Sequence, residues 1–278
     1  SHPRLACMLS TTTAAAALVA FGSIGFALGL DAMGTVQPEQ SALNGCHHVF
    51  LDIGSNVGVQ ITNVYEGKNS RMKPTFDRLF GPVADRAELV CSVVMEPNPH
   101  HADVLRGLKR RYAPARILVL NGTAASNRDG TQPFFILGSH PMYHEWGSSL
   151  LDRAGGSSAD RGHVDIRTVD LARWTHREVL RRAPKPHSKR RSAALPPAVV
   201  MKLDVEGEEY NVLPNMLAHG VLCQLDAVFL EYHDASTRHR DIENRYKVPA
   251  AFQKTINYLV AHAGRCNVTI QTLGANEI

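Results

Sequence analysis

Short apolar runs alternate with segments whose apolar residues recur at helical spacing along most of the chain. The predicted strands cover residues 48–53, 91–95, 116–121, 132–137, 164–169, 199–205, 225–232 and 267–273. The predicted helices cover residues 57–65, 100–112, 171–182, 210–220 and 249–263. Residues 66–88 contain Gly and Pro and are predicted to be an irregular insertion. The repeated alternation predicts an α/β fold with a doubly wound, mostly parallel sheet.

The N-terminal segment differs from the rest of the chain. Residues 14–30 form an apolar run without a charge, between Arg4 and Asp31. This run is borderline in length for a membrane span and long for the core of a signal peptide. We expect residues 1–31 to be a signal peptide or a single-pass signal anchor, 32–45 a linker and 46–278 the folded domain. The prediction for localisation is therefore the lumen or membrane of the secretory pathway (Golgi or ER type), or secretion.

Charge and cysteine content narrow the possibilities. The net charge of +4 is modest and much of it comes from a basic run at 181–191, so nucleic-acid binding is not predicted. A solvated loop is favoured for that run over a patch for an anionic substrate or a membrane surface. The five cysteines show no CxxC pair and no zinc-like spacing. Because Cys91 and Cys223 lie in or beside apolar segments, we expect small buried hydrophobes rather than disulfides.

A glycine turn follows the first predicted strand. Its residues are Asp52-Ile-Gly54-Ser55-Asn56-Val-Gly58. The glycines allow a sharp turn and a close approach to a ligand, and the following helix directs free N–H groups into the turn. The turn lacks both GxGxxG and GK[ST], which disfavours a nicotinamide-dependent oxidoreductase and a phosphate-binding loop. The pattern suits a nucleoside-bearing small molecule at the carboxyl end of the strand.

Acidic residues recur where the predicted strands end. In a parallel sheet, ligands and catalytic groups gather at these ends. Singly, each acid could be a helix cap or a solvated strand end. Together they predict a functional site. The residues concerned are Asp52, Glu96, Asp204, Glu206 and Glu231.

Several motifs resemble the FkbM family of S-adenosylmethionine-dependent methyltransferases. DIGSNVG, EPNP, a lone SSL, MKLDVEGEEYNVLP and EYH occur in the family's order between residues 46 and 234. The resemblance implies a Rossmann-like class I methyltransferase domain with S-adenosyl-L-methionine as cofactor. It further implies O-methylation of a hydroxyl of a glycan, glycolipid or similar small acceptor. The alternative is a non-catalytic luminal binding module that retains the fold.

The resemblance also assigns cofactor contacts. The glycine turn would line the methionine and ribose side, and Glu96 would accept hydrogen bonds from the ribose hydroxyls. Ala125, Ser126 or Asn127 would flank the adenine. The cofactor-binding residues expected on this basis are Asp52, Gly54, Ser55, Asn56, Gly58, Glu96, Asn98 and Ser126.

Methyl transfer to a hydroxyl needs a group that accepts the proton as the new bond forms. Asp204, Glu206 and His233 lie near the expected site, and histidine has the ordinary pKa nearest neutrality. Lys202 precedes Asp204 by two residues, so both face one side of the strand and the lysine would keep Asp204 ionised. We expect Asp204 to orient the hydroxyl or act as base, with His233 as the alternative base. The competing interpretation of His233 is a structural residue at the strand end.

Neighbouring histidines suggest a metal site at first sight. Adjacent histidines on a strand point to opposite faces, however, so they make poor paired ligands. The chemistry of the implied cofactor needs no metal, and we therefore predict none. The pairs are His47–His48, His100–His101 and His140/His144.

Overall fold

The computed structural model describes residues 41–136, 145, 147–151, 163–185, 194–233 and 247–273. The chain divides into two units, and the fold below is that of the unit from Gln40 to Ile278. The expected signal or anchor segment at 1–31 lies outside the described residues, as do the linker residues up to 40. Within the described part of the chain, no helix has the length and apolar character needed to cross a bilayer.

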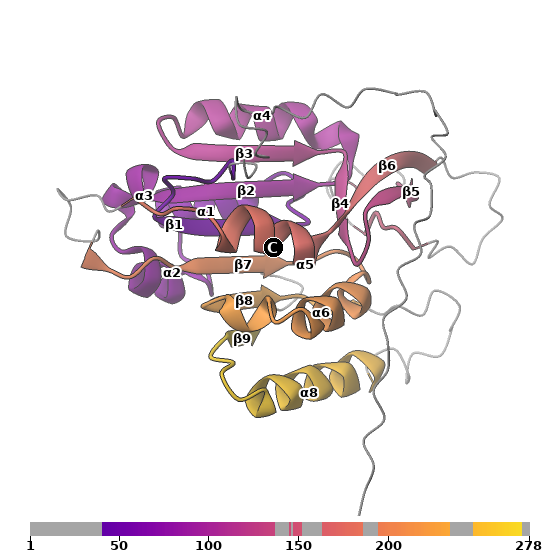
Figure 1. Cartoon of the computed structure of the whole chain (residues 1–278). Helices are drawn as coiled ribbons and strands as arrows, with labels where there is room; N and C mark the ends of the chain where they lie inside the picture. Colours follow the sequence, from indigo (N-terminus) through magenta and orange to yellow (C-terminus); the bar gives the residue numbers. More distant parts are fainter. Residues whose placement is uncertain are drawn as a thin grey trace, which may run out of the picture. The chain divides into compact units, whose positions relative to one another are not determined.

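A six-stranded sheet forms the centre of the domain, and every adjacent pair of its strands is parallel (Figure 1). The strand order is β3-β2-β1-β7-β8-β9, so the chain reverses its direction of sheet growth between β1 and β7. The predicted mostly parallel α/β fold is confirmed, and β1 and β3 have the predicted bounds. The strands are β1 (His48–Ile53), β2 (Val90–Glu96), β3 (Arg116–Asn121), β7 (Val199–Leu203), β8 (Ala227–Leu230) and β9 (Thr269–Thr272).

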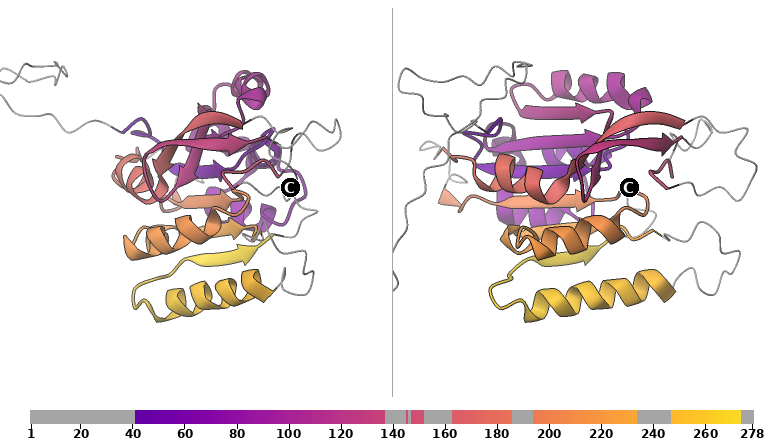
Figure 2. Two further views of the ribbon diagram at one scale, coloured as in Figure 1. Left: turned by 90° about the vertical axis from the view of Figure 1, so that its right-hand side faces the viewer. Right: turned by 45° about the vertical axis from the view of Figure 1, so that its right-hand side comes forward.

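Helices cover both faces of this sheet (Figure 2). Alternate residues of β1 point to opposite faces, as expected for a strand. Leu51 packs in one core with Trp174, Met216 and Ile256, whereas Phe50 packs in the opposite core. The helices are α1 (Val59–Glu66), α2 (Lys73–Phe80), α3 (Val83–Leu89), η1 (Pro99–His101), α4 (Ala102–Arg111), α5 (Leu171–Trp174), which continues as the π-helix η3 (Thr175–Leu180), α6 (Glu209–Ala218), η5 (Leu222–Gln224) and α8 (Lys247–His262).

A second, three-stranded sheet lies beyond the carboxyl ends of the central strands (Figure 1). Its order is β4-β6-β5, with β4 (Thr123–Ser126) parallel and β5 (Gly130–Phe135) antiparallel to β6 (His163–Asp170). Sequence periodicity predicts the two longer strands but misses β4, whose small residues carry no apolar alternation. This small sheet provides one wall of the candidate site.

Residues 66–88 are largely helical, so the prediction of an irregular insertion is wrong. They form α2 and α3, separated by Gly81 and Pro82. Pro74 lies in the first turn of α2, where its missing N–H costs nothing. Phe76 and Phe80 are one helical turn apart and both are fully buried in the core that contains Phe50. Burial of these two aromatic rings explains why the segment folds as a helix.

Two disulfides overturn the expectation of free buried cysteines. Cys46 before β1 is bonded to Cys91 in β2, and Cys223 in η5 is bonded to Cys266 before β9. The paired cysteines are 45 and 43 residues apart in sequence, so no local pattern reveals them. The first bond fixes β1 beside its parallel neighbour β2. The second connects the two segments that precede β8 and β9.

We expect non-reducing peptide mapping to recover both linked pairs. Replacing Cys46 and Cys91 together by Ala should lower the free energy of unfolding by about 4 kcal/mol, because a loop of this length loses its constraint in the unfolded chain. Urea unfolding of the variant and of the unchanged protein, both without reductant, measures the effect. Recovery of unlinked peptides from protein kept under oxidising conditions would contradict the pairing.

Candidate functional site

The glycine turn after β1 is in direct contact with the end of β7. Gly54 has φ +74°, and a Cβ there would lie 1.6 Å from the carbonyl oxygen of Asp204. Gly58 has φ +78° and precedes α1; a Cβ there would lie 2.2 Å from Leu108 Cδ1 of α4. Both glycines are therefore required by the packing of the turn, as well as by any ligand that approaches it.

Asp52 and Ser55 are buried and connect the start of the turn to its middle by a side-chain hydrogen bond. Asp52 is fully buried, and its Oδ2 accepts a hydrogen bond of 2.7 Å from Ser55 Oγ. Burial raises the pKa of Asp52, opposed by the charge of Lys202. Neither Asp52 nor Ser55 lines the adjacent cavity. Their part is to hold the turn in place.

Glu96, at the end of β2, joins two strand ends. Its Oε2 accepts from the backbone N–H of Asn56 (2.6 Å) and its Oε1 from that of Asn98 (2.8 Å). Asn56, Glu96 and Asn98 all line the cavity. A carboxylate oxygen can accept more than one hydrogen bond, so Glu96 retains capacity for ligand hydroxyls.

The cavity has a volume of about 200 Å³ and lies at the carboxyl ends of β1, β2 and β7. Part of its lining is apolar and comes from the small sheet and the segment at 147–151. The apolar residues of these two segments are Ala124, Ala125, Phe134 and Leu150, and Met95, Pro97 and Val205 add apolar lining from the ends of β2 and β7. The acidic residues are Glu96, Glu145, Asp204, Glu206, Glu208 and Glu231.

Ser126 does not lie where the resemblance implies. It is buried, and its hydroxyl donates a 2.7 Å hydrogen bond to Glu208 Oε1 instead of lining the cavity. Of the three residues proposed for the adenine end, Ala125 lines the cavity. Ser126 therefore supports the position of α6 rather than facing a ligand.

Glu145 is a cavity residue that sequence patterns do not reveal. Its carboxylate accepts from Asn98 Nδ2 (2.5 Å) and lies 3.0 Å from His100 Nδ1. Partial burial raises the pKa of Glu145, but hydrogen bonds from Asn98 and His100 outweigh burial and lower it. Because Glu145 is 47 residues from Asn98 and outside any helix or strand, only the folded chain shows the contact.

Lys202 and Asp204 form the buried ion pair that the sequence predicts. Lys202 Nζ donates to Asp204 Oδ2 (2.8 Å) and to the carbonyl oxygen of Gly54 (2.5 Å), and lies 4.0 Å from Asp52 Oδ1. Burial opposes the charge on Lys202, but Asp204 and Asp52 raise its pKa. Lys202 itself does not line the cavity, whereas Asp204 does.

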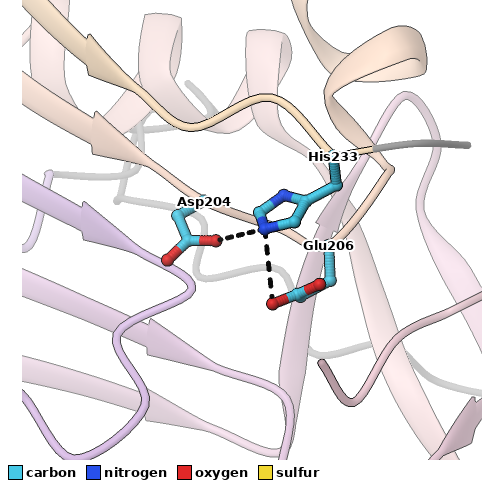
Figure 3. A group of neighbouring side chains, drawn as sticks. All are labelled: Asp204, Glu206 and His233. Atoms are coloured by element: carbon cyan, nitrogen blue, oxygen red, sulfur yellow. Dashed lines mark ion pairs between the residues drawn. The ribbon is translucent and has the colours of Figure 1, made fainter. Parts of the chain in front are cut away.

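His233, which follows β8, lies among four carboxylates. Figure 3 shows its ring directed at Asp204 and Glu206, with Nε2 at 3.7 and 3.5 Å from their oxygens. Nδ1 lies 3.0 Å from Glu209 Oε1, and Glu231 Oε1 is 3.5 Å from Nε2. Burial opposes protonation, but the hydrogen bonds to Glu209 and Glu231 and the charge of Glu206 raise the pKa of His233 to about 10.

A histidine with this pKa keeps its proton at neutral pH. The raised pKa makes His233 a poor proton acceptor, and sequence spacing does not show how many carboxylates surround its ring. Asp204 is the better candidate for a proton acceptor. Its Oδ1 has no hydrogen-bond partner among the described residues.

A tight turn places Glu206 in the cavity. Glu206 has φ +55°, and Gly207 follows with φ +101°. The carboxylate of Glu209 accepts hydrogen bonds from the N–H groups of Val205 (3.0 Å) and Gly207 (2.8 Å). Ser149 Oγ donates a 2.7 Å hydrogen bond to the carbonyl oxygen of Glu206. The left-handed conformation is unusual for Glu and is held by these contacts.

The histidine pairs do not assemble into a metal site among the described residues. His47 Nε2 contacts the carbonyl oxygen of Leu195, and burial, with the charges of His47 and Arg182, lowers the pKa of His48 to about 3. His140 and His144 lie outside the described residues. In the part of the chain that the structure describes, three other residues place metal-ligating atoms within 4.8 Å of one another: Asp204, Glu206 and His233.

Comparison with known proteins adds no relative: no family model, no curated protein and no solved structure matches the chain. The arguments below therefore depend on the motifs and on the geometry of the cavity.

We expect the buried cation of Lys202 to be essential for stability. Lys202→Met leaves the buried carboxylates of Asp52 and Asp204 without their cation and should cost about 3–5 kcal/mol in the free energy of unfolding. Denaturant unfolding measures this. The matched control is Lys109→Met on the exposed side of α4, with an expected change of at most about 0.5 kcal/mol. Equal stability of the two variants would contradict the assignment.

Proposed function

We propose that the domain is an S-adenosyl-L-methionine-dependent methyltransferase that acts on a hydroxyl of a glycan, glycolipid or similar small acceptor. The observation that carries the proposal is one cavity lined by the glycine turn, Glu96 and Asp204. It lies where the strand order reverses between β1 and β7, the usual ligand position in an open parallel sheet.

The lining of the cavity is compatible with this cofactor. Glu96 presents carboxylate oxygens suited to the two ribose hydroxyls. Ala125 and Phe134 supply apolar surface for a flat heterocycle. Asp204, Glu206 and Glu231 form an acidic region that favours a positively charged sulfonium and amine. A nicotinamide dinucleotide, with its two phosphates, would meet the repulsion of these carboxylates.

The cofactor supplies an activated methyl group, so the protein needs to align the acceptor and exclude water. Asp204 is the group we assign to the acceptor hydroxyl: its carboxylate would orient the hydroxyl and accept its proton as the oxygen–methyl bond forms and the sulfur–methyl bond breaks, releasing the neutral thioether. Lys202 holds the other oxygen of the same carboxylate at 2.8 Å. His233 and Glu206 lie beside Asp204 as positioning residues.

Two observations support a location in the secretory pathway. Disulfides persist in oxidising compartments, and the domain has two. Asn267 of the sequon Asn-Val-Thr is exposed, as a glycan acceptor must be.

We expect isothermal titration to detect binding of S-adenosyl-L-methionine and none of NADH. Glu96→Gln removes a charged acceptor and should weaken binding about tenfold, or about 1.4 kcal/mol. Glu88→Gln, on exposed α3 surface, is the matched control and should bind as the unchanged protein does. Absence of binding would contradict the proposal. Binding without methyl transfer to any glycan or glycolipid acceptor would favour the non-catalytic binding module.

A further inference from the structure

The acidic end of the cavity brings three carboxylates close to one imidazole ring. Asp204, Glu206 and Glu231 all have an oxygen within 3.7 Å of His233 Nε2. Lys202 contacts only Asp204 of these three, through Oδ2. A compact cation between the three carboxylates would relieve their mutual repulsion.

The ring of His233 is oriented by a carboxylate at one of its nitrogens, as metal-ligating histidines usually are. Glu209 lies 3.0 Å from Nδ1, and Tyr210 OH donates a 2.8 Å hydrogen bond to the carbonyl oxygen of His233. A carboxylate on one ring nitrogen directs the other nitrogen towards a metal ion. Here that other nitrogen, Nε2, faces Asp204 and Glu206 (Figure 3).

Asp204 provides an independent indication of a ligand. The residue is 8% exposed, and Lys202 occupies Oδ2. Oδ1 is buried without a hydrogen-bond partner among the described residues and is directed at the ring of His233 (Figure 3). A buried acceptor without a hydrogen bond is costly, and the 3.7 Å ion pair with His233 is too long to supply one, which points to a further ligand such as an ion.

The third carboxylate is held in place by the strained turn. Glu206 keeps its left-handed conformation through the contacts that Glu209 and Ser149 make with the turn. The ligating atoms of Asp204, Glu206 and His233 lie within 4.8 Å of one another. Metal–ligand bonds of roughly 2.0–2.2 Å let one ion span such a group after a small contraction.

We propose that Asp204, Glu206 and His233 bind one divalent cation of the Mn²⁺ type. Two carboxylates and one imidazole form an oxygen-rich ligand set with a single nitrogen. Such a set suits Mn²⁺, whereas structural zinc sites are rich in thiolates. The ion replaces the proton on Nε2. This proposal departs from the sequence-based prediction of no metal, which considered the histidine pairs and the chemistry of the implied cofactor.

Three protein ligands leave coordination positions open towards the cavity. A hydroxyl oxygen of the acceptor can occupy one of them. In the metal-bound protein Asp204 Oδ1 is a ligand of the ion, and the ion takes over from Asp204 the orientation of the hydroxyl. This orienting role rests on the proposed methyl transfer, whereas binding of the ion does not.

The test uses the full chain, stripped with EDTA, and Mn²⁺ alone without S-adenosyl-L-methionine. Electron paramagnetic resonance titration should give one bound Mn²⁺ per chain, and electron spin echo envelope modulation should show coupling to one imidazole nitrogen. His233→Gln should abolish the nitrogen coupling, and both His233→Gln and Glu206→Gln should weaken binding at least tenfold. The matched control, Asp103→Asn on exposed α4 surface, should leave both signals unchanged.

Absence of bound Mn²⁺ in the unchanged protein would overturn the metal site, as would bound Mn²⁺ without nitrogen coupling. No cofactor is present in the Mn²⁺ titration, so a failure to bind Mn²⁺ says nothing about the proposed methyl transfer. The titration with S-adenosyl-L-methionine tests that function separately. Conversely, if the protein binds Mn²⁺ but not S-adenosyl-L-methionine, the metal site stands and the role of the ion in orienting the acceptor hydroxyl is contradicted.

Discussion

The buried cation of Lys202 is the interaction on which the site depends. In the sheet, Lys202 is the register partner of Asp52 on β1, and its Nζ also reaches Asp204 and the carbonyl oxygen of Gly54. One charge thus holds the ends of β1 and β7 together, where the strand order reverses. Burial raises the pKa of Asp52, and the charge of the equally buried Lys202 opposes that rise. The glycine turn and the cavity follow from this arrangement.

Much of this arrangement follows from sequence periodicity. Continuous apolar runs defined β1 and β3 to the residue, and alternation with helices predicted the parallel sheet. The spacing of two residues between Lys202 and Asp204 predicted a same-face pair, and the structure shows it. Four of the five acidic residues at the predicted strand ends line one cavity, because parallel strands end at one edge of the sheet; Asp52 does not line it.

The remaining features depend on contacts between distant segments. Each disulfide joins cysteines more than 40 residues apart in sequence, and Glu145 meets Asn98 across 47 residues. The surroundings of His233 combine carboxylates from the β7–α6 turn, α6 and the end of β8, so its raised pKa could not be inferred from neighbouring residues. The same convergence produces the candidate metal ligands, none of which belongs to the histidine pairs visible in the sequence.

The proposed function assigns the carboxylate of Glu96 to ribose hydroxyls, the apolar lining of the cavity to a base and its acidic region to a cationic centre. A crystal structure with S-adenosylhomocysteine tests this account most directly. The account predicts ribose hydroxyls within hydrogen-bond distance of Glu96 and the sulfur directed towards Asp204. A product molecule bound elsewhere, or a cavity that stays empty at saturating concentration, would contradict it.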